Sequence, residues 1–292
     1  MPSFLKWVGT DLCCLLAASS IISLPARAAQ APSAASAPVQ STELAGIAHA
    51  AIRVADLDKS RAFYEKLGFE EAFAMSRDGK TTQSFIKVND RQFIELYPQM
   101  KTADAIGFMH VCFESSGIDA LNQAYLSRGL APLAVRKAGA GNLLFTMEGP
   151  ELQNIEYTQY MPGSKHTNDK GLHLGANRVS EQIVAMGIEM QDTAEARRFY
   201  VEKLGFAPAD SLSPSLAQGQ TWLALPGQSG LRIELVQHGP GSAFQMFFSV
   251  TDLRQATARL KALHIPVEKN KSMLTILDPD GNRIVFVVAK EG

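Results

Sequence analysis

Apolar and polar positions along this chain form a pattern that occurs more than once. Ile47 to Val54 is typical of a short strand, and the residues after it, up to Gly68, predict a helix that begins behind Asp56. Asp56 can accept hydrogen bonds from the first turn, and a glycine suits the left-handed position at a helix end. The helix pattern returns at Asp192–Phe206 with one residue inserted, so the chain is predicted to contain an internal repeat.

Four similar units follow one another along the chain. Each is predicted as a strand, a helix and three further strands, separated by turns rich in Gly, Pro, Asn and Asp, although in units three and four only two strands after the helix can be located. One unit cannot bury both faces of its small sheet, so we expect unit one to pair with unit two and unit three with unit four. The opening strands are expected at Ile47 to Val54, Gly107 to Glu114, near Glu181, and Phe244 to Val250.

The N-terminal residues 1–28 have the three parts of a secretory signal peptide. Lys6 precedes an apolar run from Leu12 to Leu24, and an Ala-x-Ala cleavage site ends at Ala28. The run is too short to span a bilayer comfortably, so we expect cleavage, no stable membrane insertion and a periplasmic or secreted protein. Residues 29–44 are rich in Ala, Pro, Ser and Gln, which is typical of a disordered linker.

Length and charge bound the remaining possibilities. The chain of 292 residues has room for two domains after the linker, predicted at 45–160 and 181–292 with a connecting segment at 161–180. The formal net charge is −1 and no basic run is present, so nucleic acid and anionic membrane surfaces are poor candidates as partners. Cys112 is the single cysteine beyond the signal peptide, so no internal disulfide is expected.

Four polar residues stand in the middle of predicted apolar strands. His49 and Glu95 lie in the first and last strands of unit one, and His110 and Glu156 lie 46 residues apart in the same way in unit two. Burying an unpaired carboxylate costs roughly several kcal/mol, and a divalent metal is one way to satisfy it. Two imidazoles and two carboxylates suit one ion of Zn, Ni, Fe(II), Co or Mn. We therefore predict a metal site made by these four residues.

The second half provides an internal control for this prediction. Because only one strong ligand is present there, we expect the second half to be a metal-free structural or pocket-completing copy. The matching positions are Ala185, Glu234, Gln245 and Val285.

Two features close to the predicted site leave alternatives open. Cys112 shares a strand face with His110 and either lines the pocket or is simply a buried thiol. The connecting segment contains four polar residues that either form a lid or second shell over the metal or belong to a plain linker. These residues are His166, Asn168, Asp169 and His173.

The repeated units and their ligand positions resemble the vicinal oxygen chelate superfamily, which includes glyoxalase I, extradiol dioxygenases and bleomycin resistance proteins. The resemblance covers Ile47 to about Ala289, and its most specific parts are the helix end Arg61–Phe69, the turn Asp278–Asn282 and the four ligand positions. It implies an α+β fold, with four βαβββ modules paired into two cupped eight-stranded sheets. It also implies one divalent transition metal that binds two adjacent oxygens of a small-molecule substrate.

The ligand set distinguishes activities within this superfamily. Glyoxalase I and its relatives also use the position of Glu95, so the resemblance implies a lyase or isomerase that moves a proton through an enediolate, with Glu156 as the catalytic base. A triad of His49, His110 and Glu156 around Fe(II) would instead indicate an extradiol-type ring-cleaving dioxygenase. Resistance proteins of this group bind small molecules without catalysis, which is a third possibility. The sequence is compatible with either a monomer or a homodimer.

Overall fold

The computed structural model describes residues 42–213, 216, 220–270 and 272–288. The predicted signal peptide at 1–28 lies outside these residues, as does the predicted linker except for its last three positions. Thr42 and Leu44 are buried, and the Leu44 backbone N–H donates to the Pro226 carbonyl at 2.9 Å. The last positions of the predicted linker thus contact the second half of the protein.

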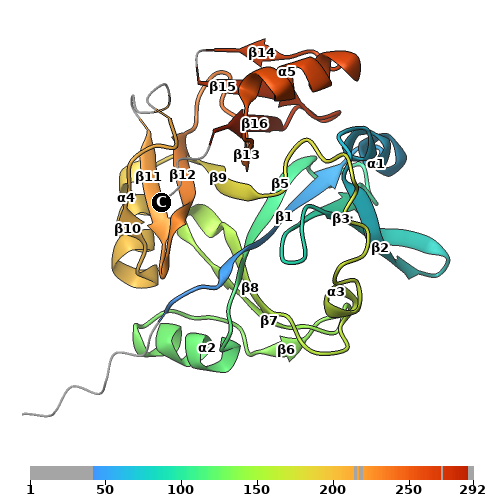
Figure 1. Ribbon diagram of the computed structural model, residues 1–292. Coiled ribbons are helices and arrows are strands. Elements are labelled where there is room, and N and C mark those ends of the chain that lie inside the picture. Colours follow the sequence, from blue (N-terminus) through green and yellow to red (C-terminus); the bar gives the residue numbers. More distant parts are fainter. Residues whose placement is uncertain (1–41, 214–215, 217–219, 271, 289–292) are drawn as a thin grey trace, which may run out of the picture. The chain divides into compact units, whose positions relative to one another are not determined.

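The first half forms one eight-stranded sheet with the strand order β2-β3-β4-β1-β5-β8-β7-β6 (Figure 1). Its two modules meet where β1 and β5 pair antiparallel, so the predicted pairing of units one and two is confirmed. Its elements are β1 (Gly46–Val54), α1 (Leu57–Lys66), β2 (Glu70–Arg77), β3 (Lys80–Lys87), β4 (Phe93–Pro98), β5 (Gly107–Glu114), α2 (Ile118–Ser127), β6 (Arg136–Lys137), β7 (Leu143–Glu148), the 3₁₀ turn η1 (Pro150–Leu152) and β8 (Asn154–Gln159).

A short helix, α3 (Lys165–Asn168), lies in the connecting segment, and the second half forms another eight-stranded sheet with the order β10-β11-β12-β9-β13-β16-β15-β14. The predicted fold class is therefore confirmed. The strands β10 and β14, which sequence analysis did not locate, contain two residues each. The elements are β9 (Ile183–Met190), α4 (Thr193–Arg198), the π-helix η2 (Phe199–Leu204), β10 (Ala207–Pro208), β11 (Thr221–Leu225), β12 (Gln228–Gln237), β13 (Gln245–Ser249), α5 (Leu253–Ala262), β14 (Glu268–Lys269), β15 (Met273–Leu277) and β16 (Arg283–Val287).

The repeated helix begins and ends in the same way in both halves, but its second part is α-helical in the first half and π-helical in the second. Asp56 caps α1 by accepting from the Lys59 N–H, and Asp192 caps α4 in the same way. Gly68 and Gly205 follow the two helices with φ of 88° and 84°. The single residue inserted into the second copy is accommodated by η2, because a π-helical turn holds one more residue than an α-helical turn.

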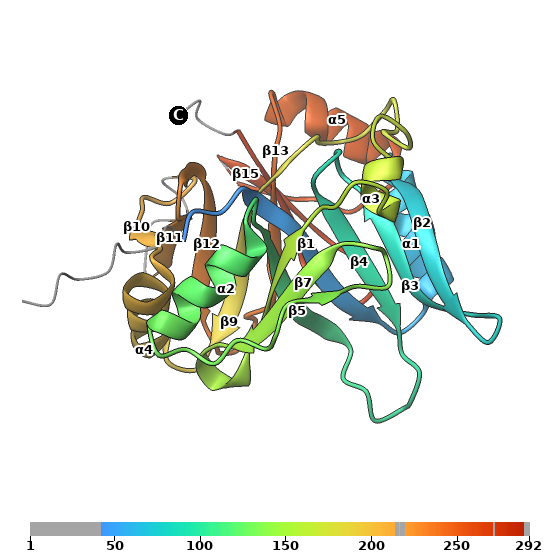
Figure 2. The ribbon, with the colours of Figure 1, turned by 90° about the horizontal axis from the view of Figure 1, so that it is seen from below.

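Residues along the central strands alternate between two environments. In β1, Ala50, Ile52 and Val54 belong to a hydrophobic core that both halves share, whereas His49 and Ala51 face the other way. Aromatic rings join the halves across this core, as in the stacked pair Phe108–Phe244 with centroids 4.4 Å apart. Figure 2 shows α2 of the first half beside the second half. The shared core thus forms between the convex faces of the two sheets, and the concave faces do not take part in it.

Within the described part of the chain, the helices are too short or too polar to cross a lipid bilayer.

Candidate metal centre

The four predicted ligands lie together on the concave face of the first sheet, on the adjacent strands β4, β1, β5 and β8. His49 is central: its Nε2 lies 3.2 Å from His110 Nε2 and 3.4 Å from Glu156 Oε1, and its Nδ1 lies 3.3 Å from Glu95 Oε1. His110 Nε2 and Glu156 Oε2 are 3.9 Å apart. The structure therefore brings all four residues of the predicted site into one cluster.

The electrostatics of the cluster suit a cation. Burial lowers the pKa of His49 well below its ordinary value and that of His110 to about 4, so both rings are neutral and retain a lone pair. Burial raises the pKa of Glu95, with a further contribution from the nearby Glu156, and raises the pKa of Glu156 to about 7. Among the described residues, no lysine or arginine forms an ion pair with either carboxyl group.

The donor set and its geometry pass a test of fit for a divalent metal. Three of the residues, His49, Glu95 and His110, each offer one ligand atom within 4.8 Å of the others. The buried His49 Nδ1 lies 3.3 Å from Glu95 Oε1 but forms no hydrogen bond with the described residues, which is unusual for a buried ring nitrogen. Neutral imidazoles and carboxylates are ligands that first-row transition metals accept. That these residues bind a metal remains a prediction.

Two polar residues that sequence analysis missed hold Glu95 in position. Tyr97 donates its hydroxyl hydrogen to Glu95 Oε2 at 2.9 Å, and Gln83 Nε2 donates to the Tyr97 hydroxyl at 2.5 Å. Burial raises the pKa of Tyr97, so the phenol remains protonated and can donate. A tyrosine two residues from Glu95, and therefore on its strand face, was the sequence signal for this support.

Of the two possibilities that the sequence left open for Cys112, the structure favours the buried thiol, since Cys112 is not among the residues that line the cavity above the cluster. The thiol is fully buried, and it also lies in the cluster, because one atom each of His49, Cys112 and Glu156 fall within 4.8 Å of one another. The strand register places Cys112 directly between these two residues on the neighbouring strands. Burial raises the pKa of the thiol well above its ordinary value, which favours the protonated form.

A cavity of about 340 Å³ opens above the cluster and is lined by three of the four predicted ligands, His49, Glu95 and Glu156. Phe85, Tyr160 and His166 contribute aromatic walls. Arg77 and Arg136 also line it; both side chains are exposed and form no hydrogen bond or ion pair with the described residues. The volume is at the lower end of the range for small-molecule sites, which is about 300–1,000 Å³.

The connecting segment forms part of this cavity, so it is more than a plain linker. We call residues 161–180 the strap. Of its four candidate polar residues, His166 is buried and lines the cavity, whereas Asn168 is exposed. Figure 1 shows α3, which carries His166, between the two outer edges of the first sheet. Asp169 and His173 do not reach the cavity lining: Asp169 binds Lys87 of β3, whereas His173 contacts Asp169 within the strap.

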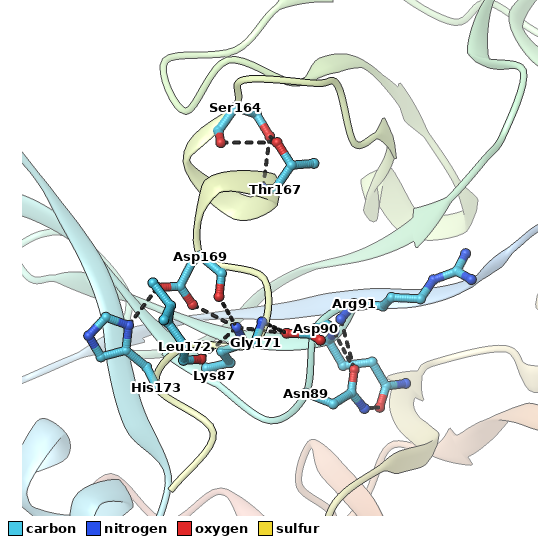
Figure 3. Close-up of polar contacts among 11 residues, drawn as sticks. Lys87, Asn89, Asp90, Arg91, Ser164, Thr167, Asp169, Gly171, Leu172 and His173 are labelled. Carbon is cyan, nitrogen blue, oxygen red and sulfur yellow. Dashed lines mark hydrogen bonds and ion pairs between the residues drawn. The ribbon is translucent and has the colours of Figure 1, made fainter.

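A buried lysine that sequence analysis missed anchors the strap (Figure 3). Lys87 is fully buried at the end of β3, and its Nζ lies 2.7 Å from Asp169 Oδ2 and 2.9 Å from Asp90 Oδ1. The same Nζ donates to the backbone carbonyls of Asp169 at 2.5 Å and Leu172 at 2.8 Å. Asp169 Oδ1 in turn contacts His173 Nδ1 at 2.5 Å. A buried cation with this many partners fixes the position of the strap on the sheet.

The second sheet has no such cluster at the corresponding positions. The strand register pairs Gly187 with both Glu234 and Gln245, as Ala51 pairs with Glu95 and His110 in the first sheet, so the proposed equivalences hold. Glu234 is fully buried, and burial raises its pKa to about 8. Apolar side chains fill the rest of this concave face: Ala185, Leu212, Leu216, Trp222, Phe247, Val285 and Val287.

The family of this chain follows from its sequence as well as from its fold. The sequence profile of the Glyoxalase/Bleomycin resistance protein/Dioxygenase superfamily matches residues 46–155 and 182–286, one match in each half. The chain therefore belongs to this superfamily, as the resemblance predicted. A search of the curated proteins found no significant match.

Solved structures with this fold include enzymes of two kinds. An extradiol ring-cleaving dioxygenase from Brevibacterium fuscum is 19% identical, with a TM-score of 0.64 over 87% of this chain and 74% of its own. Homoprotocatechuate 2,3-dioxygenase from Arthrobacter globiformis is 20% identical, with a TM-score of 0.62 over 86% and 82%. An Mn(II)-bound glyoxalase from Novosphingobium aromaticivorans is 17% identical, with a TM-score of 0.64 over 85% and 83%. At these identities the similarity establishes the fold alone.

Proposed function

We propose that this protein is a metal-dependent lyase or isomerase of the glyoxalase type, acting on a small substrate with two adjacent oxygens. The observation that carries the proposal is the position of Glu95. Its carboxylate lies 3.3 Å from His49 and is oriented by Tyr97, so the cluster has a second built carboxylate in addition to Glu156. A facial triad of two histidines and one carboxylate would not need it.

The chain's own residues would divide the work as follows. His49, Glu95, His110 and Glu156 would hold the divalent transition metal. When bound, the metal supplies Lewis-acid chemistry that lowers the cost of removing a proton next to a carbonyl group. Glu156 is the proton carrier, because its side chain is the most accessible of the four, at 13% exposure, and lines the cavity. The aromatic walls exclude water from the reacting carbon.

The cavity favours a small organic anion as the substrate. Its volume of about 340 Å³ lies near the lower end of the range for small-molecule sites, which suits a small substrate. Arg77 and Arg136, at its lining, form no hydrogen bond or ion pair with the described residues, and the charge of Arg136 acts on Glu156 across the cavity lining. Arginine is suited to recognising carboxylate groups because its planar fork of donors matches their geometry.

Metal content is the first measurement. The chain from Ala29 onward and its His110→Ala variant would be purified without added metal and compared by elemental analysis. Near one equivalent of a transition metal in the wild type, lost in the variant, supports the site, and the identity of the metal ranks the chemistries. The absence of metal from both proteins, even after incubation with Fe, Ni, Zn, Co and Mn, would count against an enzyme and favour a binding protein.

Proton transfer can be measured without knowing the natural substrate. The metal-containing protein would be incubated in D2O with hemithioacetals of methylglyoxal and small thiols, and with 2-hydroxy ketones. Deuterium entering the carbon next to the carbonyl, followed by proton NMR, is the expected result, and Glu156→Gln should abolish it. Exchange at the same rate in Glu156→Gln would contradict the role of this carboxylate.

An extradiol-type dioxygenase is the second candidate. The dioxygenase structures align with 86–87% of this chain and therefore with all four of its modules. In that case His49, His110 and Glu156 would form the triad. Fe(II)-dependent consumption of O2 with catechol-like substrates would replace the isomerase proposal. Stoichiometric binding of small molecules without turnover, unchanged by Glu156→Gln, would instead support a binding or resistance protein.

We further propose that the protein is exported, on the basis of the signal-like residues 1–28. Export makes a glutathione hemithioacetal a poor natural substrate, since that thiol pool is mainly cytoplasmic. Cell fractionation, together with N-terminal sequencing of the purified protein, tests this. A periplasmic or secreted chain that begins at Ala29 is expected, and an uncleaved cytoplasmic chain would contradict it.

A further inference from the structure

The environment of His166 differs from that of His49 and His110 in the cluster. Its ring is 4% exposed and stacks on Tyr160 at a centroid distance of 5.0 Å. Phe73, Phe85 and Phe93 approach it edge to face, with centroids 4.7 to 5.3 Å away. The strap therefore inserts an imidazole into an aromatic surrounding on the wall of the metal cavity.

The hydrogen bonds of Asn142 determine which ring nitrogen of His166 carries the hydrogen. Asn142 Oδ1 accepts the Met161 backbone N–H at 3.2 Å, so the amide nitrogen must be the atom that faces His166. That Nδ2 lies 2.9 Å from His166 Nδ1 and donates to it. Nδ1 is thus an acceptor, and since burial lowers the pKa of the ring to about 4, the single hydrogen of the neutral ring is on Nε2.

The Nε2–H group of His166 is buried and forms no hydrogen bond with the described residues. A buried donor without an acceptor costs free energy, so such a group in a native structure asks for an explanation. A phenylalanine would pack equally well among these aromatic rings without leaving a donor unpaired. The cavity that His166 lines is the place from which an acceptor can arrive.

The position of the donor is fixed from outside the cavity. Lys87 holds the strap by Asp169, three residues after His166, and Asp90 accepts the Gly171 N–H at 2.8 Å (Figure 3). The Lys165 N–H donates to the Ala140 carbonyl at 2.8 Å, which attaches α3 to the loop before β7. A donor held in this way needs little reordering when a ligand binds, and such preorganisation raises affinity.

We propose that His166 is a substrate-binding residue, and that its Nε2–H donates a hydrogen bond to an oxygen of the substrate in the metal cavity. The proposal rests on the proposed function, because it takes the ligand to be an oxygen chelate held over the cluster. It gives the strap a specific role: it completes the recognition of the substrate from the wall of the cavity that His166 forms.

Ligand binding tests the proposal without any assay of turnover. Acetohydroxamate, a small anion with two adjacent oxygens, would be titrated calorimetrically into the Zn-containing wild type and three variants. His166→Phe should weaken binding about tenfold, the value of one hydrogen bond. His166→Gln, which can present an amide N–H, should recover most of the affinity. His173→Gln, a change at the other strap histidine, whose side chain is 44% exposed, is the control and should bind as the wild type does.

Spectroscopy of the wild type makes the test independent of how the variants fold. With ¹⁵N-labelled histidine, the ring of His166 should give the Nε2–H tautomer, and its N–H resonance should move downfield when acetohydroxamate is added. Equal affinities in all four proteins, or an unmoved resonance at saturation, would overturn the role of His166 and leave the proposed function standing. Failure of the Zn-containing wild type to bind the probe would overturn both.

Discussion

The two sheets of this protein have the same strand order, but their concave faces carry different side chains. The concave face of the first sheet carries His49, Glu95, His110 and Glu156 below a cavity of about 340 Å³. On the second sheet, apolar residues occupy the positions of His49 and Glu156, and Trp222 packs against Phe247 with centroids 5.2 Å apart. The fold therefore provides one concave face in each half, which we call the first and the second cup. The side chains on each concave face decide whether that cup can hold a ligand.

The buried carboxyl groups of the two cups show the same difference. Glu95 and Glu156 lie beside two imidazoles in a cavity that a cation can enter, whereas the hydrogen bond of Glu234 within the described residues comes from the Gln245 amide, 3.4 Å from its Oε2. Glu234 Oε1 forms no hydrogen bond with any residue that the structure describes. A carboxyl group in this position is best tolerated as the neutral acid, which agrees with its pKa of about 8.

The largest expected effect is on the rate of proton exchange, which should depend on Glu156 and not on Glu234. Glu156→Gln should lower the rate of proton exchange by about 10²- to 10⁴-fold, the usual contribution of a positioned acid or base. Glu234→Gln makes the same chemical change in the second cup and should leave the rate unchanged. Deuterium incorporation measured by NMR compares the two. A large loss of rate in Glu234→Gln would mean that the second cup takes part in the reaction.

Metal removal should lower stability through the first cup alone. A metal at 1,000 times its Kd stabilises the native state by about 4 kcal/mol, because it binds the folded chain and not the unfolded one. Chelation should therefore lower the melting temperature of the wild type, measured by calorimetry. Chelation should have little effect on His110→Ala and nearly the full effect on Glu234→Gln. An equal fall in His110→Ala would place the metal elsewhere.

The strap over the first cup is attached by a buried ion pair, whereas the second cup is filled by apolar side chains. Lys87→Met should reduce the free energy of unfolding by about 3–5 kcal/mol, because it leaves Asp169 buried without its cation. Lys170→Met removes an exposed lysine of the same strap and should change it little. Urea unfolding provides both values, and similar values for the two variants would contradict the role of Lys87.

The smallest effect concerns pH and Glu234. Burial raises its pKa from an ordinary 4.5 to about 8, so between these values the folded chain keeps a proton that the unfolded chain has lost. The stability of the wild type should accordingly fall as the pH rises from about 4.5 through 8, relative to Glu234→Gln. At pH 8.5 the variant should be the more stable protein, and at pH 4 the difference should vanish.

Thermal melts across this pH range compare the two proteins. Parallel stability curves would mean that Glu234 ionises in the folded state as it does in the unfolded chain.

Much of the fold was available from the sequence because its signals are local or repeated. Asp56 and Asp192 mark helix starts by their capping chemistry, and strand alternation places Glu95 on the face opposite Ile94 and Leu96. The equal spacing of the two His and Glu pairs predicted the cluster. In contrast, β10 and β14 have two residues each, which is too short to produce any periodic pattern.

What the sequence by itself determined was the set of four modules, their pairing and the residues that meet in the first cup, because period, capping and repetition are properties of the chain alone. Only the tertiary structure decided that Lys87 anchors the strap and that His166 enters the cavity. Lys87 and Asp169 are 82 positions apart, and an attraction between such distant residues has no local signal. The physical reason is that burial, which gives both contacts their strength, exists only after the chain has folded.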